Sequence, residues 1–425
     1  MTTATPINAG YKQTELGVIP EEWEMKKLEE VADPNQRWSF TGGPFGSNLK
    51  SSDYTNDGVR IIQLQNIGDG IFHNNYAVFT SIDKADELLS CNIYPGDIIL
   101  SKMGDPVARA CIIPPYHERY LMCSDGIRLA VDKKKYNTYF VYLFINAPNF
   151  RNRAANAGTG STRKRIGLTE LRNLELPSPS LPEQSAIATV LSDTDALIEN
   201  LEKLIGKKKA IKQGTMQQLL TGKKRLPGFS GEWEVKKLGE IFSLSATYSK
   251  SKFINDSGNY LIMDMGSVSS VGGMIASKRT HLSIDPLNKG DLVMPKDDIG
   301  GGNIIGKVAY IDQNNKYVLG DHVYKLAVKI SGIETLFISY LINSNTVNSE
   351  LRKKVSGSAQ LGLGRKSVEE QNVNIPIDKN EQISIATILF DMDIEIEALE
   401  QKRDKYDMLK QGMMQVLLTG TIRLI

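Results

Sequence analysis

The sequence predicts an α+β protein in which two similar strand-rich α/β lobes alternate with two long helices packed as a coiled coil. The first observation is a repeat: residues 181–226 realign without a gap with residues 379–424, and 24 of the 46 positions are identical. The second is that EWEMKKLEEV at 22–31 recurs as EWEVKKLGEI at 232–241. The repeated unit is therefore a Trp-containing entry, a lobe and a helix. This order predicts a duplicated scaffold, in which one structural unit occurs twice.

The repeat sets the expected boundaries. The lobes have diverged in sequence while the helices have not, which indicates one scaffold carrying two differently tuned heads. The expected segments are an N-terminal segment 1–21, a first lobe 22–178, a central helix 179–222, a second lobe 223–376 and a C-terminal helix 377–425.

The two helices are predicted from apolar residues spaced alternately by three and four, the pattern of one helix packed along another. About 40 residues at about 1.5 Å each would make a rod of roughly 60 Å. Gly222 and Gly420 are placed as C-terminal caps, and the recurrence of Gly214 and Gly412 suggests a close helix crossing or a tolerated kink. The predicted seam comprises Ile187, Val190, Leu197, Leu201, Leu204 and Ile211 in the first helix, and Ile385, Ile388, Met392, Leu399, Tyr406, Leu409 and Met413 in the second.

Each lobe is predicted to be rich in short strands, because brief apolar runs alternate with Gly, Asn, Asp and Pro. Residues 139–145 form a longer apolar run that suits a buried helix. Residues 96–102 of the first lobe, GDIILSK, match residues 290–296 of the second, GDLVMPK. The economical inference is the same fold twice.

Composition excludes several classes of protein. No apolar run approaches the roughly 18 residues of a membrane-spanning helix, and residues 1–10 lack the plan of a signal peptide. The three cysteines and four dispersed histidines support neither a disulfide framework nor a metal site. We therefore expect a cytoplasmic protein without a membrane partner. The net charge is only +2, so any nucleic-acid signal must come from local clusters.

The clearest cluster is a basic loop near the end of each lobe. Residues 151–165 contain no acid and enclose the small residues AANAGTGST, which suit phosphate contact because they add amides and hydroxyls without bulk. A solvated loop is the alternative, and its return in the second lobe weakens that alternative. The basic residues are Arg151, Arg153, Arg163, Lys164 and Arg165 in the first lobe, and Lys296, Arg352, Lys353, Lys354, Arg365 and Lys366 in the second.

No convincing active site is visible. Residues 301–307 read G-x-x-x-x-G-K, but Val308 replaces the Ser or Thr of a P-loop and a strand is expected to follow, so we interpret a turn. Residues 146–150, NAPNF, only partly match the loop of adenine methyltransferases. Asp97 and Asp291 are interpreted as caps of turns at strand entries. The sequence therefore predicts a chain that is not an enzyme and binds no cofactor and no metal.

Three segments carry a resemblance to a known family. TELGVIPEEWEMKKLEEV, LPSPSLPEQSAIATVL and LLTGKKRLPGFSGEWEVKKLGEI resemble the specificity subunit of type I restriction-modification systems over nearly the whole chain. The match is specific in the helices and their flanks and weak in the lobes. Asn380 stands where the first copy has Pro182.

The resemblance implies that each lobe is a target recognition domain and that the helices are conserved spacers forming an antiparallel coiled coil. It implies double-stranded DNA as ligand, and as partners two methyltransferase subunits and the restriction subunits recruited to them. The complex would methylate adenine and cleave unmodified DNA in an ATP-dependent reaction, with no catalysis by this chain.

Two differing lobes related by a pseudo-twofold would read a bipartite, asymmetric site, because duplex DNA has local dyads. Base reading needs Arg, Lys, Asn and Gln at groove edges. A coiled-coil adaptor whose lobes bind proteins, without DNA specificity, is the second hypothesis, and a fused restriction enzyme is the third. Candidate reading residues in the first lobe are Asn48, Lys50, Gln63, Gln65, Asn66 and Lys102.

Overall fold

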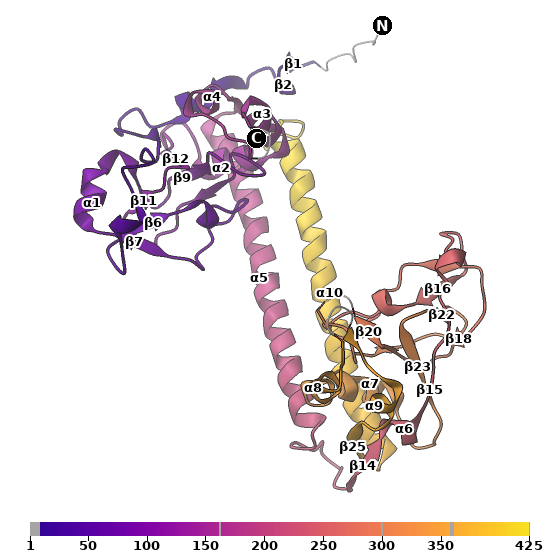
Figure 1. The fold of residues 1–425 in the computed structure, drawn as a ribbon. Coiled ribbons are helices and arrows are strands. Elements are labelled where there is room, and N and C mark those ends of the chain that lie inside the picture. The colour runs from indigo at the N-terminus through magenta and orange to yellow at the C-terminus, as the bar shows by residue number, and fades with distance from the viewer. Residues whose placement is uncertain (1–8, 161–162, 299–300, 358–360, 425) are drawn as a thin grey trace. The chain divides into compact units, whose positions relative to one another are not determined.

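The computed structural model describes residues 9–160, 163–298, 301–357 and 361–424 (Figure 1). The chain forms two compact units. Unit one comprises Met1–Leu201 and Lys402–Ile425, and unit two comprises Glu202–Gln401. Each unit therefore combines one lobe with portions of both long helices.

Unit one contains two principal sheets. The first has the order β10-β9-β12-β4 and is antiparallel throughout, and the second has the order β5-β7-β6-β11-β8 with β6 and β11 parallel. A short pair, β3 (Glu24–Lys27) with β13 (Glu175–Ser178), joins the start and end of the lobe. The strands are β4 (Phe40–Gly42), β5 (Tyr54–Thr55), β6 (Val59–Ile62), β7 (Val78–Thr80), β8 (Asn92–Ile93), β9 (Ile98–Ser101), β10 (Ala110–Ile112), β11 (Tyr120–Met122) and β12 (Gly126–Leu129).

Short helices complete unit one. Helix α2 confirms the predicted buried helix, since Phe140 to Ile145 are all buried there. The N-terminal hairpin pairs β1 (Tyr11–Thr14) with β2 (Gly17–Pro20). The helices are α1 (Ile82–Glu87), α2 (Thr138–Asn146), α3 (Pro148–Ala157) and α4 (Leu168–Arg172).

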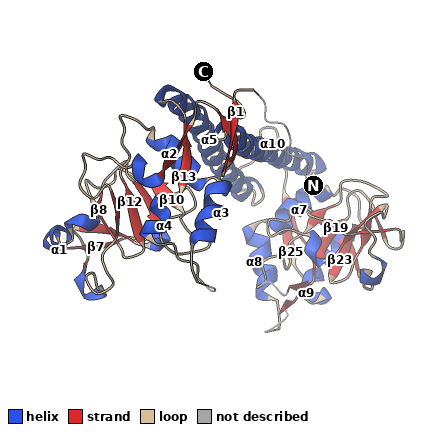
Figure 2. Ribbon diagram, turned by 90° about the horizontal axis from the view of Figure 1, so that it is seen from above, coloured by secondary structure: helices blue, strands red, loops and turns tan. Residues whose placement is uncertain are grey.

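Unit two repeats this topology, which confirms the expectation of one fold used twice. Its sheets have the orders β15-β23-β19-β21 and β17-β16-β22-β18, and the second again holds one parallel pair, β16 with β22. Figure 2 shows the strands of each lobe gathered together with short helices beside them. The strands are β14 (Trp233–Lys237), β15 (Phe242–Ser245), β16 (Tyr260–Met263), β17 (Arg279–Thr280), β18 (Pro286–Leu287), β19 (Leu292–Pro295), β20 (Asp297–Asp298), β21 (Ala309–Tyr310), β22 (Tyr317–Leu319), β23 (Val323–Val328), β24 (Leu361–Gly362) and β25 (Asn372–Pro376); the helices are α6 (Leu238–Ile241), α7 (Thr335–Asn343), α8 (Asn345–Lys353) and α9 (Arg365–Glu369).

The long helices are α5 (Leu181–Leu219) and α10 (Lys379–Leu417). Gly222 and Gly420 follow them with a φ of +69° each, so the predicted C-terminal caps are confirmed. The close crossing suggested for Gly214 and Gly412 is wrong, because a Cβ at either position would meet nothing within 4 Å.

The helices run antiparallel. In unit two, Lys208 and Lys209 of α5 pair with Glu395 and Glu400 of α10, each at 2.6 Å. In unit one, Lys410 of α10 pairs with Asp195 of α5 at 2.5 Å. No helix among the described residues is long and apolar enough to cross a membrane.

The predicted seam needs correction at several positions. Ile187, Leu201 and Ile385 are buried, but Val190, Leu204, Ile211 and Leu409 are exposed. The buried column of α5 lies one residue further along, at Leu191, Ile198 and Ile205. Both columns repeat every seven residues and both are apolar, so spacing alone could not separate them. The remaining predicted positions, Leu197, Ile388, Met392, Leu399, Tyr406 and Met413, are half-buried.

A buried carboxylate holds the start of each long helix. Glu183 accepts hydrogen bonds from the Trp23 indole at 3.1 Å and from Arg423, which follows α10, at 2.8 Å. Glu381 accepts hydrogen bonds from Nε and Nη2 of Arg225, which follows α5, at 2.5 and 2.6 Å. The end of one helix is thus tied to the start of the other in each unit.

The glutamines that follow these two glutamates also make equivalent hydrogen bonds in the two units. Gln184 donates to the Pro179 carbonyl at 2.9 Å, and Gln382 donates to the Pro376 carbonyl at 2.8 Å. These bonds satisfy backbone groups where the lobe joins the helix, so they explain why Glu-Gln survives in both copies of the repeat.

Candidate nucleic-acid interface

Several loops of unit one converge on one edge of the four-stranded sheet. The pairing register places Gly42 opposite Ile127 and Gly126 opposite Ser101, so β4 and β9 end where β12 begins. The turn after β6 joins them, because the Cys123 amide donates to the Ile62 carbonyl at 2.9 Å. The loops after β4, β6 and β9 and the β11–β12 connection therefore share this edge.

Lys102 lies at the centre of this edge. Its amide donates to the Asp125 carbonyl at 2.7 Å, and its carbonyl accepts from Ile166 at 2.9 Å. A Cβ on Gly42 would stand 2.7 Å from the Lys102 ammonium, so glycine there leaves room for this side chain. Burial, reinforced by the charge of Arg165, lowers the pKa of Lys102. A cation destabilised in this way gains from the approach of an anion.

The basic loop runs beside Lys102. The backbone of Arg165 forms isolated antiparallel β-bridges with Thr159 and with Met103. The Gly104 amide donates to the Lys164 carbonyl at 3.3 Å. Arg165 pairs with Asp125, whereas Arg163 is exposed and has no ion-pair partner among the described residues. The structure therefore brings Lys102 together with the predicted loop cations Arg163, Lys164 and Arg165.

Unit two holds Lys296 in the same frame. Its amide donates to the His322 carbonyl at 3.0 Å, and its carbonyl accepts from Leu363 at 2.7 Å. The strand β20, directly after Lys296, pairs with β24 of the basic loop. The two lysines are thus equivalent in backbone bonding as well as in sequence.

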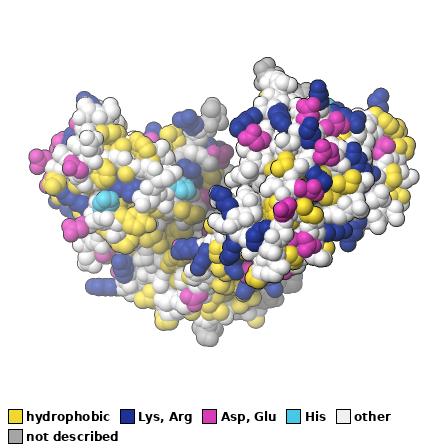
Figure 3. Space-filling model, turned by 90° about the horizontal axis from the view of Figure 1, so that it is seen from below, with side chains coloured by type: hydrophobic (Ala, Val, Ile, Leu, Met, Phe, Trp, Pro, Cys, Tyr) yellow, Lys and Arg dark blue, Asp and Glu magenta, His cyan; other side chains and the backbone are white. Residues whose placement is uncertain are grey.

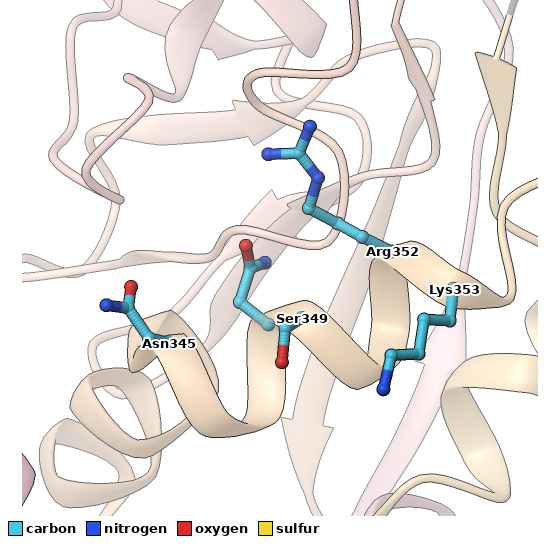
Figure 4. Close-up of a pocket in the computed structure, with 5 residues that line it drawn as sticks. Asn345, Ser349, Arg352 and Lys353 are labelled. Atoms are coloured by element: carbon cyan, nitrogen blue, oxygen red, sulfur yellow. The ribbon is translucent and has the colours of Figure 1, made fainter.

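The other predicted cations of unit two lie on two short helices, except Lys354, which directly follows α8. Arg352 and Lys353 line an open pocket with Asn345, Asn348 and Ser349 of α8 (Figure 4). Arg365 and Lys366 begin α9 and pair with Glu369 and Glu370 at 2.8 and 3.8 Å. Lys354 donates to Gln371 at 2.9 Å. All of these cations are exposed, so they remain candidates for phosphate contact.

Arg151 and Arg153, which the sequence predicts to contact phosphate, are both engaged in hydrogen bonds within unit one. Arg151 is 7 % exposed and bound to Asp69 and to Asn146, and burial lowers its pKa. Arg153 donates to the Glu175 carbonyl at 2.6 Å. Arg151 is therefore a structural residue and its assignment to DNA is wrong. Charge counting could not detect this, because the paired acid lies 82 residues earlier in the sequence.

The candidate base-reading residues separate in the same way. Gln63 and Gln65 follow β6 and are bonded to each other at 3.2 Å, while Asn48 and Lys50 lie exposed after β4. Asn66 is fully buried: its amide donates to the His73 and Tyr76 carbonyls, each at 2.9 Å. Asn66 is wrong as a reader, because its polar atoms are already satisfied inside the turn.

The two lobes carry different chemistry on the same frame. The registers of the parallel pairs place Met263 where unit one has Ile62, so Asp264 corresponds to Gln63. Asp264 pairs with Lys278 at 2.5 Å, which has no counterpart at Gln63. Likewise His322 stands where unit one has Asp125. The central lysine is kept while its neighbours change.

The part of the chain that the structure describes shows no evident catalytic or metal site. No group of three or more His, Cys, Asp or Glu side chains in the described ranges could hold a metal ion. The described residues of 301–307 form turns, as interpreted, and Asn146 binds the Ala110 backbone. Asp97 and Asp291 accept from the amides of Tyr94 and Asn288 at 3.0 and 2.7 Å, which confirms both as turn caps. Figure 3 shows Lys and Arg interspersed with Asp and Glu, in keeping with the small net charge.

Comparison with known proteins gives a consistent result. The family model "Type I restriction modification DNA specificity domain" matches residues 20–213 and again 230–405. A Methanocaldococcus jannaschii protein described as the putative type I restriction enzyme MjaX specificity subunit is 23 % identical, over 97 % of this chain and 96 % of its own. The type I restriction enzyme StySPI specificity subunit of Salmonella potsdam is 22 % identical, over 81 % and 76 %.

Solved structures show the same fold. The S subunit of a type I restriction-modification system from M. genitalium aligns with a TM-score of 0.62 at 17 % identity, over 98 % of this chain and 99 % of its own. A chain from a study of assembly of a type I restriction-modification system aligns with a TM-score of 0.53 at 15 % identity, over 95 % and 99 %. Because the specificity-domain model matches twice and covers most of the sequence, the chain belongs to the family of type I restriction-modification specificity subunits, which are non-catalytic recognition subunits.

Proposed function

We propose that this chain reads a bipartite, asymmetric DNA sequence, with one half-site assigned to each unit. The observation that carries the proposal is the equivalence of Lys102 and Lys296, which are bonded alike while Gln63 and Asp125 are replaced by Asp264 and His322. A constant cation suits the constant phosphate backbone, and changed polar neighbours suit different bases.

The chain also docks the enzymes that act on the DNA. The partners are two methyltransferase subunits and the restriction subunits, in a cytoplasmic complex without a membrane component. Adenine methylation and ATP-dependent cleavage belong to those partners. The chain itself binds no cofactor, and we expect S-adenosylmethionine to be retained by the assembled complex but not by the purified chain in equilibrium dialysis.

Selection from a random duplex library by the chain assembled with its methyltransferase subunits tests the proposal. Two different short blocks, separated by a spacer of fixed length and random sequence, are expected among the selected duplexes. A protein–protein adaptor without DNA specificity would enrich no sequence, and that result would reject the proposal.

A further inference from the structure

One exposed aromatic side chain stands beside the cationic edge of unit one. Phe45 is 88 % exposed, in the turn that follows β4, and the Asn48 amide closes this turn on the Phe45 carbonyl at 2.8 Å. Pro44 is buried on one side of the turn, and Leu49 packs against a buried cluster on the other. The turn is anchored at both ends while its aromatic ring points into solvent.

The anchoring continues into the sheet. The Gly43 amide donates to the Gly126 carbonyl at 2.8 Å, and a Cβ on Gly43 would lie 1.8 Å from the Cys123 carbonyl oxygen. Only glycine allows that approach, which fixes where the chain leaves the sheet. The ring makes no aromatic or cation–π contact in the described ranges.

Phe45 is close to the central lysine. Gly42 adjoins the Lys102 ammonium and precedes Phe45 by three residues, a span of at most about 11 Å in extended chain. Successive phosphates of one strand follow a rise of about 3.4 Å per base pair. A strand whose phosphate binds Lys102 would therefore bring its next few bases within reach of Phe45.

Unit two carries an aromatic residue in the equivalent loop, one residue before Ser249, which the strand registers place at the position of Phe45. Tyr248 follows β15 and is 54 % exposed, and the buried Lys250 ammonium lies 5.0 Å from its ring centroid. Lys250 is itself fixed by the Leu319 carbonyl at 2.7 Å. The same loop thus presents an aromatic ring in both lobes, bare in one and supported by a cation in the other.

We propose that Phe45 is a wedge that inserts at a base step of the half-site read by unit one, while the neighbouring cations hold the phosphates. Apolar side chains used in this way separate a pair of stacked bases and bend the duplex. Insertion makes recognition depend on how easily that step unstacks, so Phe45 is a specificity-determining residue. This inference rests on the proposed DNA-reading function.

The test uses the chain assembled with its methyltransferase subunits and a duplex carrying the motif mapped by adenine methylation in the source genome. 2-Aminopurine, whose fluorescence rises on unstacking, replaces each base of both half-sites in turn. The wild-type complex should brighten one step in a single half-site, in addition to any signal at the methylated adenine. Phe45→Ala should abolish that signal and weaken binding about 5- to 150-fold, the range found when an aromatic ring that stacks on a base is removed.

Two variants are controls. Phe45→Trp keeps an insertable ring and should keep the signal. Tyr116→Ala removes a 59 % exposed aromatic beyond the opposite edge of the same sheet, since β10 places Ile112 opposite Ile98 at the start of β9. It should change neither signal nor affinity. Unchanged signal and affinity in Phe45→Ala would overturn the wedge and leave the proposed function intact. Failure of the wild-type complex to prefer its motif would instead overturn the proposed function, and the wedge with it.

Discussion

At the scale of single residues, the candidate interface is a set of cations that differ in whether a partner within the protein already binds them. Arg165 is neutralised by Asp125, Lys164 donates to the Ala155 carbonyl at 3.2 Å, and Arg163 is exposed. Exposed cations contribute to DNA affinity mainly by releasing counterions from phosphates, so their contribution should depend on salt.

Replacing Arg163, Lys164 and Arg165 together by Ala should weaken DNA binding by the assembled complex. The slope of log affinity against log salt should become shallower by about 0.9 for each phosphate that is no longer bound. Lys133, Lys134 and Lys135 supply a matched control, since they are exposed and follow the far end of β12. Their replacement removes the same charge and should leave the slope nearly unchanged. Equal slopes for both triple variants would show that the basic loop does not touch phosphate.

Lys102 should matter more per residue than any loop cation. Its half-buried ammonium has a lowered pKa, and a bound phosphate would relieve that destabilisation. Lys102→Gln should therefore reduce affinity of the complex about tenfold or more, which is about 1.4 kcal/mol. Titration of the motif duplex at fixed salt measures this. An affinity equal to that of wild type would remove Lys102 from the interface.

Residue roles were only partly predictable from the sequence. The sequence identifies Lys102 and Lys296 because their strands match, and it identifies the basic loop because acids are absent there. It could not identify Arg151 as structural, because its partner Asp69 lies 82 residues away, nor Asn66, because its partners are backbone carbonyls of the turn that follows it. Phe45 was missed, although an apolar residue in the Gly-Pro-Phe-Gly run at 43–46 was a visible signal.

At the scale of elements, the long helices are fixed by their ends and by their register. Glu381 is 1 % exposed and its charge is balanced by Arg225, so removing one partner leaves the other uncompensated. The equivalent pair in unit one is Glu183 with Arg423. Glu183 and Arg225 of the first copy correspond to Glu381 and Arg423 of the second copy. Each ion pair therefore joins the start of one long helix to the segment that follows the other.

Arg225→Ala should destabilise unit two, since it leaves the carboxylate of Glu381 buried without its counterion. The midpoint of urea unfolding, followed by circular dichroism, should move to a lower urea concentration. Glu397→Ala provides the comparison, because this residue is exposed on the same helix and should cost at most about 0.5 kcal/mol. Indistinguishable midpoints for the two variants would show that the ion pair does not hold the helix start.

Helix length offers a test of spacing between the half-sites. An insertion in α5 alone would shift Lys208 and Lys209 against their partners on α10, so it must be matched in both helices. Four residues after Lys203 and four after Gln401, the equivalent positions of the repeat, add about 6 Å to each helix. The half-sites should keep their bases, and the spacer should lengthen by about one or two base pairs at about 3.4 Å each.

A matched insertion of two residues is the control for that experiment. Four residues turn the helix by about 400°, leaving the apolar seam only about 40° out of phase, whereas two turn it by about 200°. The shorter insertion should therefore abolish assembly of the complex. Sequencing of methylated DNA reads both results. An active four-residue variant with its original spacer would show that the helices do not set the distance.

At the scale of the whole molecule, the repeat made the architecture predictable. Two copies of one unit, each with a helix ending in glycine, were sufficient to infer two similar lobes and two packed helices, and the family resemblance added their antiparallel direction. The exact positions of the helix seam were not predictable from the sequence. Leu204 and Ile205 belong to two adjacent apolar columns that differ only by the rotation of one residue. The lobe sheets emerge only from long-range pairing, which leaves no periodic signal in such short strands.

The separation of DNA recognition from catalysis is also a property of the whole molecule. The purified chain should show neither methyltransferase nor nuclease activity, because its polar clusters serve turns, helix starts and the cationic edge. Incubation with labelled S-adenosylmethionine and unmodified DNA checks this. Activity that persists after rigorous removal of every partner subunit would contradict the assignment of all chemistry to the partners.

The proposed function is that this chain specifies a bipartite, asymmetric sequence through two differing lobes. Strand-resolved mapping of adenine methylation in the source genome, with the gene intact and with it deleted, tests this specificity. We expect one methylated motif of two unlike blocks, modified on both strands, that disappears on deletion and returns when the gene is restored. Methylation that survives deletion, or a vanished motif that is a single continuous block, would contradict it.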